Sequence, residues 1–317
     1  MMEQNNRYIF IFNPAADKGR ARLKSDWLAS MVAQRENSEM QTTAYPGHAG
    51  EIARSGTSSD SCLIACGGDG TLHEVVNAVA EDPVTVGVLP IGSANDFIKT
   101  LNPASGTLNG IGHFFGSQRK SVDLGIVHFN GEGRRYFINS LGVGFTGRIA
   151  RTVKKTIWLK GELSYVHALL SVLAGYCPLM MHIRITGEDS MVELDEPVFA
   201  FSVSNGRVEG GKFIIAPHAE LADGLLDVCI LRAIPKYEFF RFVLKYLKGT
   251  HIEDPKVVYC KAKSVEITLP EPDVMHMDGE VYENISGRIT ISVGPEMLSI
   301  ICGTPQGNPS HQTVVKE

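Results

Sequence analysis

The stretch Gly67-Gly68-Asp69-Gly70-Thr71-Leu72-His73-Glu74 directly follows the apolar run Cys62-Leu63-Ile64-Ala65-Cys66, and a valine-rich helical pattern comes next. This order predicts a buried strand, a glycine turn and a helix. Glycines let the backbone approach a ligand closely, and the free N–H groups at a helix N-terminus favour phosphate. Because a bare carboxylate would repel a polyphosphate, Asp69 indicates a metal ion between the two. An ordinary strand-to-helix turn with an aspartate cap explains this segment alone about as well.

Two other apolar runs in the first part of the chain also end in polar loops. Residues 8–12 end at Asn13, and residues 85–89 end at Pro90. Helix-like spacing of apolar residues separates such runs, which predicts a parallel sheet covered by helices on both faces. The loops at the carboxyl ends of its strands would then form the binding site.

After about residue 123 the chain is dominated by short strand-like runs separated by Gly, Pro, Asp and Asn, the pattern of a β-sandwich. These runs are residues 124–129, 136–140, 181–186, 198–203, 225–231, 264–269 and 288–293. Helical interruptions are expected at 163–174 and 236–247. We therefore predict an α/β nucleotide-binding domain (1–125), a mostly β domain (126–302) and a flexible tail (303–317).

Composition restricts the class of protein. A net charge of −5 and a pI near 6.1 give no sign of nucleic-acid binding. The six cysteines form no Cys-x-x-Cys pair and no signal peptide is evident. We therefore expect the protein to be located in the reducing cytoplasm. The apolar stretch 166–183 is just long enough to be considered as a membrane span, but Pro178 and two histidines argue against one. A core helix is expected there, with a surface that touches lipid as the alternative.

Polar side chains in the three loops could bind a nucleotide and a metal. Lys18 could meet phosphate oxygens, although a solvated loop explains it as well. Ser93 could bind a nucleotide phosphate, while a helix cap accounts for Asn95 or Asp96. Three carboxylates from separate loops, Asp69, Asp96 and Asp123, could converge. Grouped carboxylates attract Mg²⁺, which binds through one or two of them plus water and substrate phosphates.

The run Gly142-Val143-Gly144-Phe145-Thr146-Gly147 matches the dinucleotide fingerprint letter for letter. That fingerprint requires a following helix and then a parallel strand that ends at an acid. Here residues 148–155 are strongly basic, and Glu162 does not stand at a strand end. We therefore predict a turn of the β-sandwich that lines the cleft instead of a dinucleotide site.

Two acidic turns lie further along the chain. Asp223-Gly224 precedes an apolar run, and it is either a hairpin turn or a site for a hard cation. Asp278-Gly279-Glu280 places two carboxylates around one glycine. Either carboxylate could act as a general base on a substrate hydroxyl.

Taken in order, these segments resemble the diacylglycerol kinase catalytic-domain family, which includes bacterial lipid kinases and sphingosine and ceramide kinases and is related to NAD kinase and phosphofructokinase. The resemblance covers residues 8–301. Its markers are Asn13-Pro14, Gly19-Arg20, Gly67-Gly68-Asp69-Gly70-Thr71 with Glu74 and Asn77, Gly92-Ser93-Ala94-Asn95-Asp96-Phe97, Asp123-Leu124-Gly125, Asn139 with Gly142 and Gly144, Ser204-Asn205-Gly206, Gly210-Gly211, Ala216-Pro217, Asp223-Gly224 with Leu226-Asp227, and Asp278-Gly279-Glu280.

The resemblance implies phosphotransfer from ATP to a lipid hydroxyl, in a cleft between a Rossmann-like three-layer α/β domain of the NAD-kinase and phosphofructokinase type and a C-terminal β-sandwich. It implies ATP contacts at Asn13, Lys18, Thr43, Gly67, Gly68, Asp69, Gly70, Thr71, Glu74, Ser93 and Asn95. It also implies a magnesium–water network on Asp69, Asp96 and Asp123, and a second, structural magnesium on Asp223 with the carbonyls of Glu220 and Leu225. Asp69 and either Asp278 or Glu280 would be catalytic.

The chain departs from the family pattern at the second metal site, where Ala222 replaces the first acid of the usual Asp-Asp-Gly. Lipid would be presented at a membrane surface, which the basic stretch 148–160 could approach without a transmembrane segment. A homodimer is a reasonable expectation for such an enzyme. Two alternatives stay open, a kinase for a soluble acceptor such as NAD and a nucleotide-binding regulator without turnover.

Overall fold

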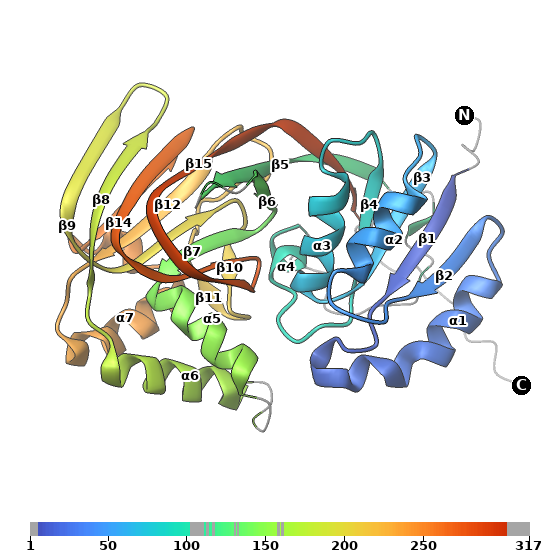
Figure 1. Ribbon diagram of the computed structural model, residues 1–317, viewed down its shortest axis with the longest axis horizontal. Coiled ribbons are helices and arrows are strands. Elements are labelled where there is room, and N and C mark those ends of the chain that lie inside the picture. Colours follow the sequence, from blue (N-terminus) through green and yellow to red (C-terminus); the bar gives the residue numbers. More distant parts are fainter. Residues whose placement is uncertain are drawn as a thin grey trace, which may run out of the picture.

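The computed structural model describes residues 6–101, 111, 114–115, 118–129, 131, 133–156, 159 and 162–302 (Figure 1). An N-terminal part of alternating strands and helices lies beside a C-terminal part made mostly of strands. The expected tail, 303–317, lies outside the described residues. No helix in the described ranges is both long and apolar enough to cross a membrane.

The N-terminal part alternates strand and helix as the sequence predicts. Its elements are β1 (Arg7–Phe12), η1 (Asp17–Lys24), α1 (Ser25–Ala33), β2 (Ser38–Thr42), α2 (His48–Gly56), β3 (Ser61–Gly67), α3 (Asp69–Val79), β4 (Thr85–Pro90) and α4 (Asp96–Leu101). The strands lie in the order β2-β1-β3-β4, and every neighbouring pair is parallel. The predicted parallel sheet is therefore confirmed.

The two faces of this sheet bury different apolar clusters, because successive side chains of a strand point to opposite faces. In β1, Ile9 and Ile11 pack with residues of α2 and α3, whereas Phe10 and Phe12 pack with α1. Helices thus cover both faces, which gives the expected three layers. The loops after β1, β3 and β4 leave the sheet at one edge.

The C-terminal part contains most of the strands. Its elements are β5 (Gln118–His128), β6 (Arg135–Phe137), β7 (Ser140–Gly144), α5 (Phe145–Lys155), α6 (Glu162–Gly175), β8 (Leu179–Thr186), β9 (Met191–Ser204), β10 (Val208–Glu209), β11 (Phe213–Ile214), β12 (Leu226–Arg232), α7 (Lys236–Lys248), η3 (His251–Glu253), β13 (Val257–Ala262), β14 (Ser264–Met277) and β15 (Glu280–Cys302). The helices expected at 163–174 and 236–247 are α6 and α7.

Four strands of the C-terminal part enclose its core. β9 and β14 each pair with β7 near one end and with β8 near the other, and all four pairings are antiparallel. The side chains between them form one apolar cluster, which includes Val143, Ile183, Phe201 and Met275. The expected β-sandwich is confirmed.

Two long strands join the parts into one sheet. β15 pairs with β14 over its first half, and its end pairs in parallel with β4 at Ser299 and Ile300. β5 runs antiparallel to the second half of β15, from Thr290 to Cys302. The last strand therefore returns to the N-terminal sheet, while the exact domain boundaries stay a prediction.

Two local predictions are wrong. The apolar stretch 166–183 is not one core helix, since α6 ends at Gly175 and β8 begins at Leu179, with Pro178 between them. The glycine run 142–147 is not a simple sandwich turn, because α5 begins within it at Phe145. In the described part of the chain, however, β7 pairs antiparallel with β9 and β14 and has no parallel neighbour such as a dinucleotide site requires.

Candidate active site

The loops that follow β3 and β4 are in backbone contact. The N–H groups of Ile91 and Gly92 donate to the carbonyl of Gly67, at N···O distances of 2.8 and 3.0 Å. A Cβ placed on Gly92 would lie 2.3 Å from the Cα of Gly68, so a side chain there would push the loops apart. The glycines therefore fix the distance between the two loops.

The loop after β1 joins them through Asn13, whose Nδ2 donates to Thr71 Oγ1 at 2.9 Å. Gly68 stands at the N-cap of α3, where a residue without a side chain cannot cap the helix. The first turn of α3 thus begins beside three converging loops with no capping side chain of its own. Such an N-terminus favours phosphate.

Lys18 and Ser93 have protein partners. Ser93 Oγ donates to Asp17 Oδ1 at 2.7 Å, and Arg20 donates to the same oxygen. Burial opposes the ionisation of Asp17, but these two hydrogen bonds outweigh it and lower its pKa. Lys18 Nζ donates to the carbonyl of Thr156, 2.9 Å away in the C-terminal part. Their expected phosphate contacts stay predictions.

Glu74, Asn95 and Thr43, for which ATP contacts are also expected, make hydrogen bonds within the protein or lie buried. The Glu74 carboxylate accepts the N–H groups of Gly47 and Ala49 at 2.8 and 3.1 Å, which caps the N-terminus of α2. Asn95 both donates to and accepts from the backbone of its own turn. Thr43 is buried just beyond β2. In this arrangement Glu74 and Asn95 hold loops in place.

Asp69 and Asp96 form an anionic pair at the starts of α3 and α4. Asp69 Oδ1 accepts the Asp96 N–H at 2.8 Å, and Asp96 Oδ1 accepts the Gly211 N–H at 2.8 Å. Burial and the negative charge of Asp96 raise the pKa of Asp69 to about 7. Burial also raises the pKa of Asp96, against the opposing charge of Lys99.

This pair fits the magnesium ion that the family resemblance implies. A divalent cation would stabilise both ionised carboxylates, and oxygen is the ligand that Mg²⁺ prefers. Within the residues that the structure describes, no three His, Cys, Asp or Glu side chains gather to hold a metal. Phosphate oxygens and water would have to complete the coordination, as is usual for Mg²⁺.

Asp123 does not complete this pair, so the expected convergence of three carboxylates is wrong in this respect. Its Oδ2 accepts the Gly224 N–H at 2.8 Å, and its own N–H donates to the carbonyl of Leu221 at 2.7 Å. Burial and the charge of Asp223 raise its pKa. Asp123 thus anchors the turn that precedes β12.

The residues around Asp223 do not fit the second magnesium that the resemblance implies. The Lys261 ammonium, on β13, already pairs with Asp223 Oδ2, and the Leu225 N–H donates to Oδ1 at 3.1 Å. Burial disfavours the charged amine, but the Asp223 bond outweighs it and raises the pKa of Lys261. Ala222 supplies no second carboxylate, and the carbonyl of Glu220 does not make up for that missing ligand.

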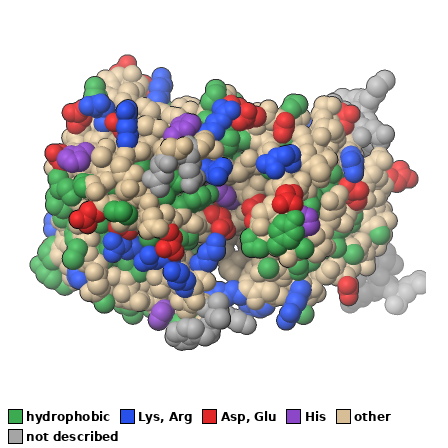
Figure 2. Space-filling model, in the orientation of Figure 1, with side chains coloured by type: hydrophobic (Ala, Val, Ile, Leu, Met, Phe, Trp, Pro, Cys, Tyr) green, Lys and Arg blue, Asp and Glu red, His purple; other side chains and the backbone are tan. Residues whose placement is uncertain are grey.

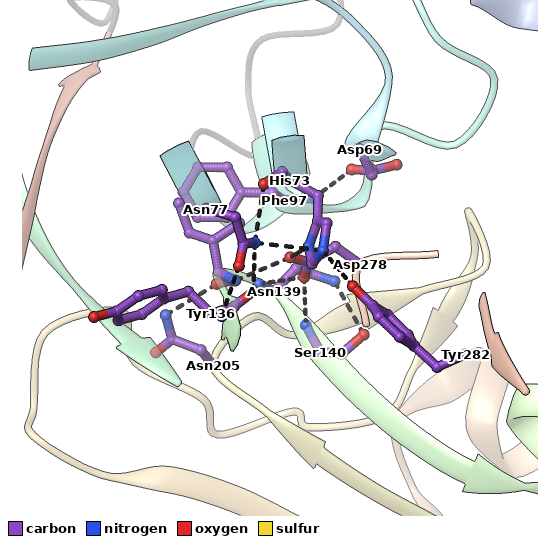
Figure 3. Close-up of polar contacts among 11 residues, drawn as sticks. Asp69, His73, Asn77, Phe97, Tyr136, Asn139, Ser140, Asn205, Asp278 and Tyr282 are labelled. Atoms are coloured by element: carbon purple, nitrogen blue, oxygen red, sulfur yellow. Dashed lines mark hydrogen bonds and ion pairs between the residues drawn. The ribbon is translucent and has the colours of Figure 1, made fainter. Parts of the chain in front are cut away.

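Asp278 is a buried acceptor whose two oxygens are both engaged (Figure 3). Oδ1 accepts the N–H groups of Asn139 and Ser140 at 2.9 and 3.1 Å. Oδ2 accepts the Ile138 N–H at 3.1 Å and pairs with His73 Nδ1 at 2.9 Å. Four donors therefore surround a carboxylate that is only 1% exposed.

His73 carries this network from Asp278 to the surrounding strands (Figure 3). Its Nδ1–H faces the Asp278 carboxylate, so Nε2 is the acceptor for Tyr282 Oη at 3.1 Å. Asn77 Nδ2 donates to the Tyr136 carbonyl at 2.8 Å. The result is a polar bridge between α3 and the strands β6 and β15.

Glu280 is the accessible carboxylate of the pair. Its side chain is 36% exposed, and Oε2 accepts from Lys154 Nζ at 2.7 Å. A Cβ placed on Gly70 would lie 2.5 Å from Glu280 Oε1. The carboxylate therefore lies directly over the first turn of α3. Figure 2 shows a hollow between the two halves of the molecule on this face.

Sequence reasoning missed His73, Lys154 and Lys261 as parts of the site. His73 stands inside the glycine-loop stretch, but its partner Asp278 is far along the chain. Lys154 belongs to a basic run that was interpreted as a lipid contact. Lys261 lies in β13, a strand that the apolar pattern did not indicate. Only tertiary pairing identifies these three side chains.

Comparison with known proteins adds two family matches. Residues 7–127 match the diacylglycerol kinase catalytic domain, and residues 139–302 match the YegS C-terminal NAD kinase beta sandwich-like domain. A Bacillus subtilis protein named diacylglycerol kinase is 30% identical over 291 residues, which cover 89% of this chain and 92% of that protein. A Staphylococcus carnosus protein of the same name is 31% identical over 282 residues, with 86% and 88% covered.

Solved structures show the same architecture. The crystal structure of a putative diacylglycerol kinase from Bacillus anthracis superposes with a TM-score of 0.73 at 21% identity, covering 96% of this chain and 97% of that one. Another from the same organism gives a TM-score of 0.69 at 22% identity, covering 94% and 97%. Both likenesses concern the two-domain fold.

Proposed function

Because this chain belongs to the diacylglycerol kinase catalytic-domain family, we propose that it transfers the γ-phosphate of ATP, with Mg²⁺, to the hydroxyl of a diacylglycerol-like lipid. The observation that carries the proposal is the position of the Glu280 carboxylate. It lies over Gly70, in the turn expected to hold phosphate, beside the acidic pair Asp69 and Asp96. A base for the acceptor and a cradle for the donor thus meet at one place.

The donor side of the reaction needs positioning and charge neutralisation more than covalent chemistry. In our proposal the glycine turn 67–71 and Asn13 bind the triphosphate at the N-terminus of α3. Asp69 and Asp96 would hold the magnesium ion, which neutralises charge on the β- and γ-phosphates. Thr43, Lys18 and Ser93 complete the nucleotide contacts.

On the acceptor side we assign the base to Glu280. The lipid hydroxyl gives its proton to Glu280 Oε1 while its oxygen forms a bond to the γ-phosphorus. The bond from that phosphorus to the β–γ bridging oxygen breaks, and ADP leaves with the electron pair. The Lys154 ammonium donates to the other oxygen of Glu280 at 2.7 Å and holds the carboxylate in place.

Asp278 is a positioning residue in this scheme. Its oxygens already accept three backbone N–H groups and a bond from His73, which leaves no free lone pair aimed at a substrate. It instead holds the turn that presents Glu280. Gly279 makes that turn possible with φ +83°.

The test is transfer of label from γ-labelled ATP with Mg²⁺ to mixed micelles that contain diacylglycerol, followed by organic extraction. Label in the organic phase, lost in Asp69→Asn, supports the proposal. Label that stays in an aqueous acceptor such as NAD would indicate the NAD-kinase-like alternative. Nucleotide binding without any transfer would indicate a regulator. We further propose that the lipid is drawn from the cytoplasmic face of a membrane. The expected homodimer is a separate proposal, which gel filtration would test.

A further inference from the structure

Two helices of the C-terminal part carry apolar ridges that face away from the protein. On α6 the ridge is Leu163, Val166 and Leu170, and on α7 it is Tyr237, Phe240, Leu244 and Leu247. Spacings of three and four residues place each set on one side of its helix. Of thirteen large apolar side chains that are exposed in the described residues, seven are on these two helices.

These ridges are not needed to hold the helices in place. The opposite side of α7 buries Phe239, Phe242 and Tyr246 in one apolar cluster, which also takes Leu173 of α6. Lys236 Nζ of α7 donates to the Ala174 carbonyl of α6 at 2.8 Å. Both helices lie along the same edge of the molecule in Figure 1. The exposed ridges therefore belong to two anchored, neighbouring helices.

Charge identifies the partner that such a surface fits. From Leu163 to Gly175, α6 has no Asp, Glu, Lys or Arg. α7 exposes Lys236 and Lys248 beside its ridge. Its exposed Arg241 pairs with Asp254, and its single acid, Glu238, pairs with Lys256. An apolar ridge flanked by cations is the composition of a helix that lies in the interface of an anionic bilayer. A second copy of this chain would bring like charges together.

The inner side of α6 connects this surface to the catalytic acids. Tyr165, next to the exposed Val166, lies 3.3 Å from the position of a Cβ on Gly210, beside the loop that binds Asp96. Burial raises the pKa of Tyr165, and the negative charges of Asp96 and Asp69 raise it further. α6 thus exposes apolar side chains on its outer side, while Tyr165 on its inner side lies beside the loop that binds Asp96.

We propose that the ridges of α6 and α7 form the surface by which this enzyme docks on an anionic lipid bilayer, with α6 at the point where the acceptor lipid enters. The purpose of this surface rests on the proposed function. It differs from the basic stretch 148–160, whose side chains pair with acids, Arg148 with Asp273 and Lys154 with Glu280. Ile157, Trp158 and Lys160 lie outside the described residues.

The test is sedimentation of the full chain with vesicles of equal parts phosphatidylglycerol and phosphatidylcholine, and with phosphatidylcholine alone. Wild type is expected to sediment with the anionic vesicles. Phe240→Ser/Leu244→Ser and Leu163→Ser/Leu170→Ser should each lower the partition coefficient about tenfold or more, since each removes two apolar side chains from the bilayer. A double variant of two exposed methionines away from the helices, Met191→Ser/Met297→Ser, is the matched control.

Thermal unfolding should be unchanged in the α6 and α7 variants, and phosphotransfer to a short-chain diacylglycerol in micelles should be unchanged in the α7 variant. The proposal is overturned if wild type stays in the supernatant, or if the variants sediment as wild type does. It is also overturned if wild type is a dimer that these variants dissociate, because the ridges then form a subunit interface. If the proposed function is wrong, the protein would bind the vesicles but transfer phosphate to no lipid.

Discussion

Replacing each carboxylate of the turn at 278–280 by its amide, one at a time, distinguishes the proposed catalytic role of Glu280 from the structural role of Asp278. Glu280→Gln removes the proposed base but keeps its shape. Loss of a general base lowers the rate about 10²–10⁴-fold, which is about 2.7–5.5 kcal/mol of activation free energy. Among the described residues, this variant breaks only the exposed ion pair with Lys154, and such pairs contribute less than about 1 kcal/mol to stability.

Asp278→Asn is expected to lower the stability of the protein instead of removing the catalytic base. Each oxygen of the buried carboxylate accepts two hydrogen bonds, so an amide NH₂ in place of either oxygen faces two donors. Hydrogen bonds to a charged group contribute about 1.5–3 kcal/mol each, so the loss of two lowers the free energy of unfolding by about 3–6 kcal/mol. That is a large part of the stability of a typical domain.

The assay combines kcat, measured with ATP and micellar diacylglycerol, with urea unfolding of each variant. Glu280→Gln should lose turnover with an unchanged unfolding midpoint, and Asp278→Asn should unfold at clearly lower urea. Below its transition, the Asp278 variant should retain part of its kcat. Turnover within about threefold of wild type in Glu280→Gln would refute the assignment of the base, since even weak general bases contribute more.

Three other predictions follow from the same geometry. Since the folded pKa of Asp69, about 7, lies above its ordinary value of 3.8, stability attributable to this group falls as pH rises between these values; Asp69→Asn should therefore raise Tm near pH 8 but not near pH 4, by thermal shift. Gly70→Ala should push Glu280 aside and lower kcat at least about tenfold, whereas Gly133→Ala, with nothing within 4 Å, should not. Lys261→Ala should lower the free energy of unfolding by about 1 kcal/mol, and its difference in Tm from wild type should be the same in EDTA and in Mg²⁺; a smaller difference in Mg²⁺ would show that this turn binds the ion once the ammonium is gone.

The sequence was sufficient for the parallel sheet and for the three loops at its edge. The spacing of apolar residues and the length of each apolar run identify the strands and helices of such a sheet from local sequence. The carboxyl ends of its parallel strands must then lie at the same edge. The glycines at 67, 68 and 92 were recognisable because close backbone contact excludes a side chain. The family resemblance added the order of the C-terminal segments.

The pairing of charged side chains could not be predicted in this way. Asp69, Asp96 and Asp123 are alike as aspartates after apolar strands, yet Asp123 is held by the turn at Gly224. That contact depends on where the turn before β12 lies against Asp123 of β5, and the neighbouring Asp223 pairs with Lys261 of β13; neither contact has a local signal. Apolar runs are ambiguous in a related way, because the outward ridge of α6 and a buried helix face have the same composition.

The proposed base and the phosphate cradle are held together by a single strand. Glu280 is the first residue of β15, and the end of that strand pairs with β4, whose loop contacts the glycine turn at Gly67. On the other side of the cleft, Lys18 is bonded to the carbonyl of Thr156. Because a continuous strand resists stretching, the distance between donor and acceptor sites is set by the fold before substrates bind. In the proposed reaction, catalysis would then depend on a preformed arrangement more than on closure of one domain over the other.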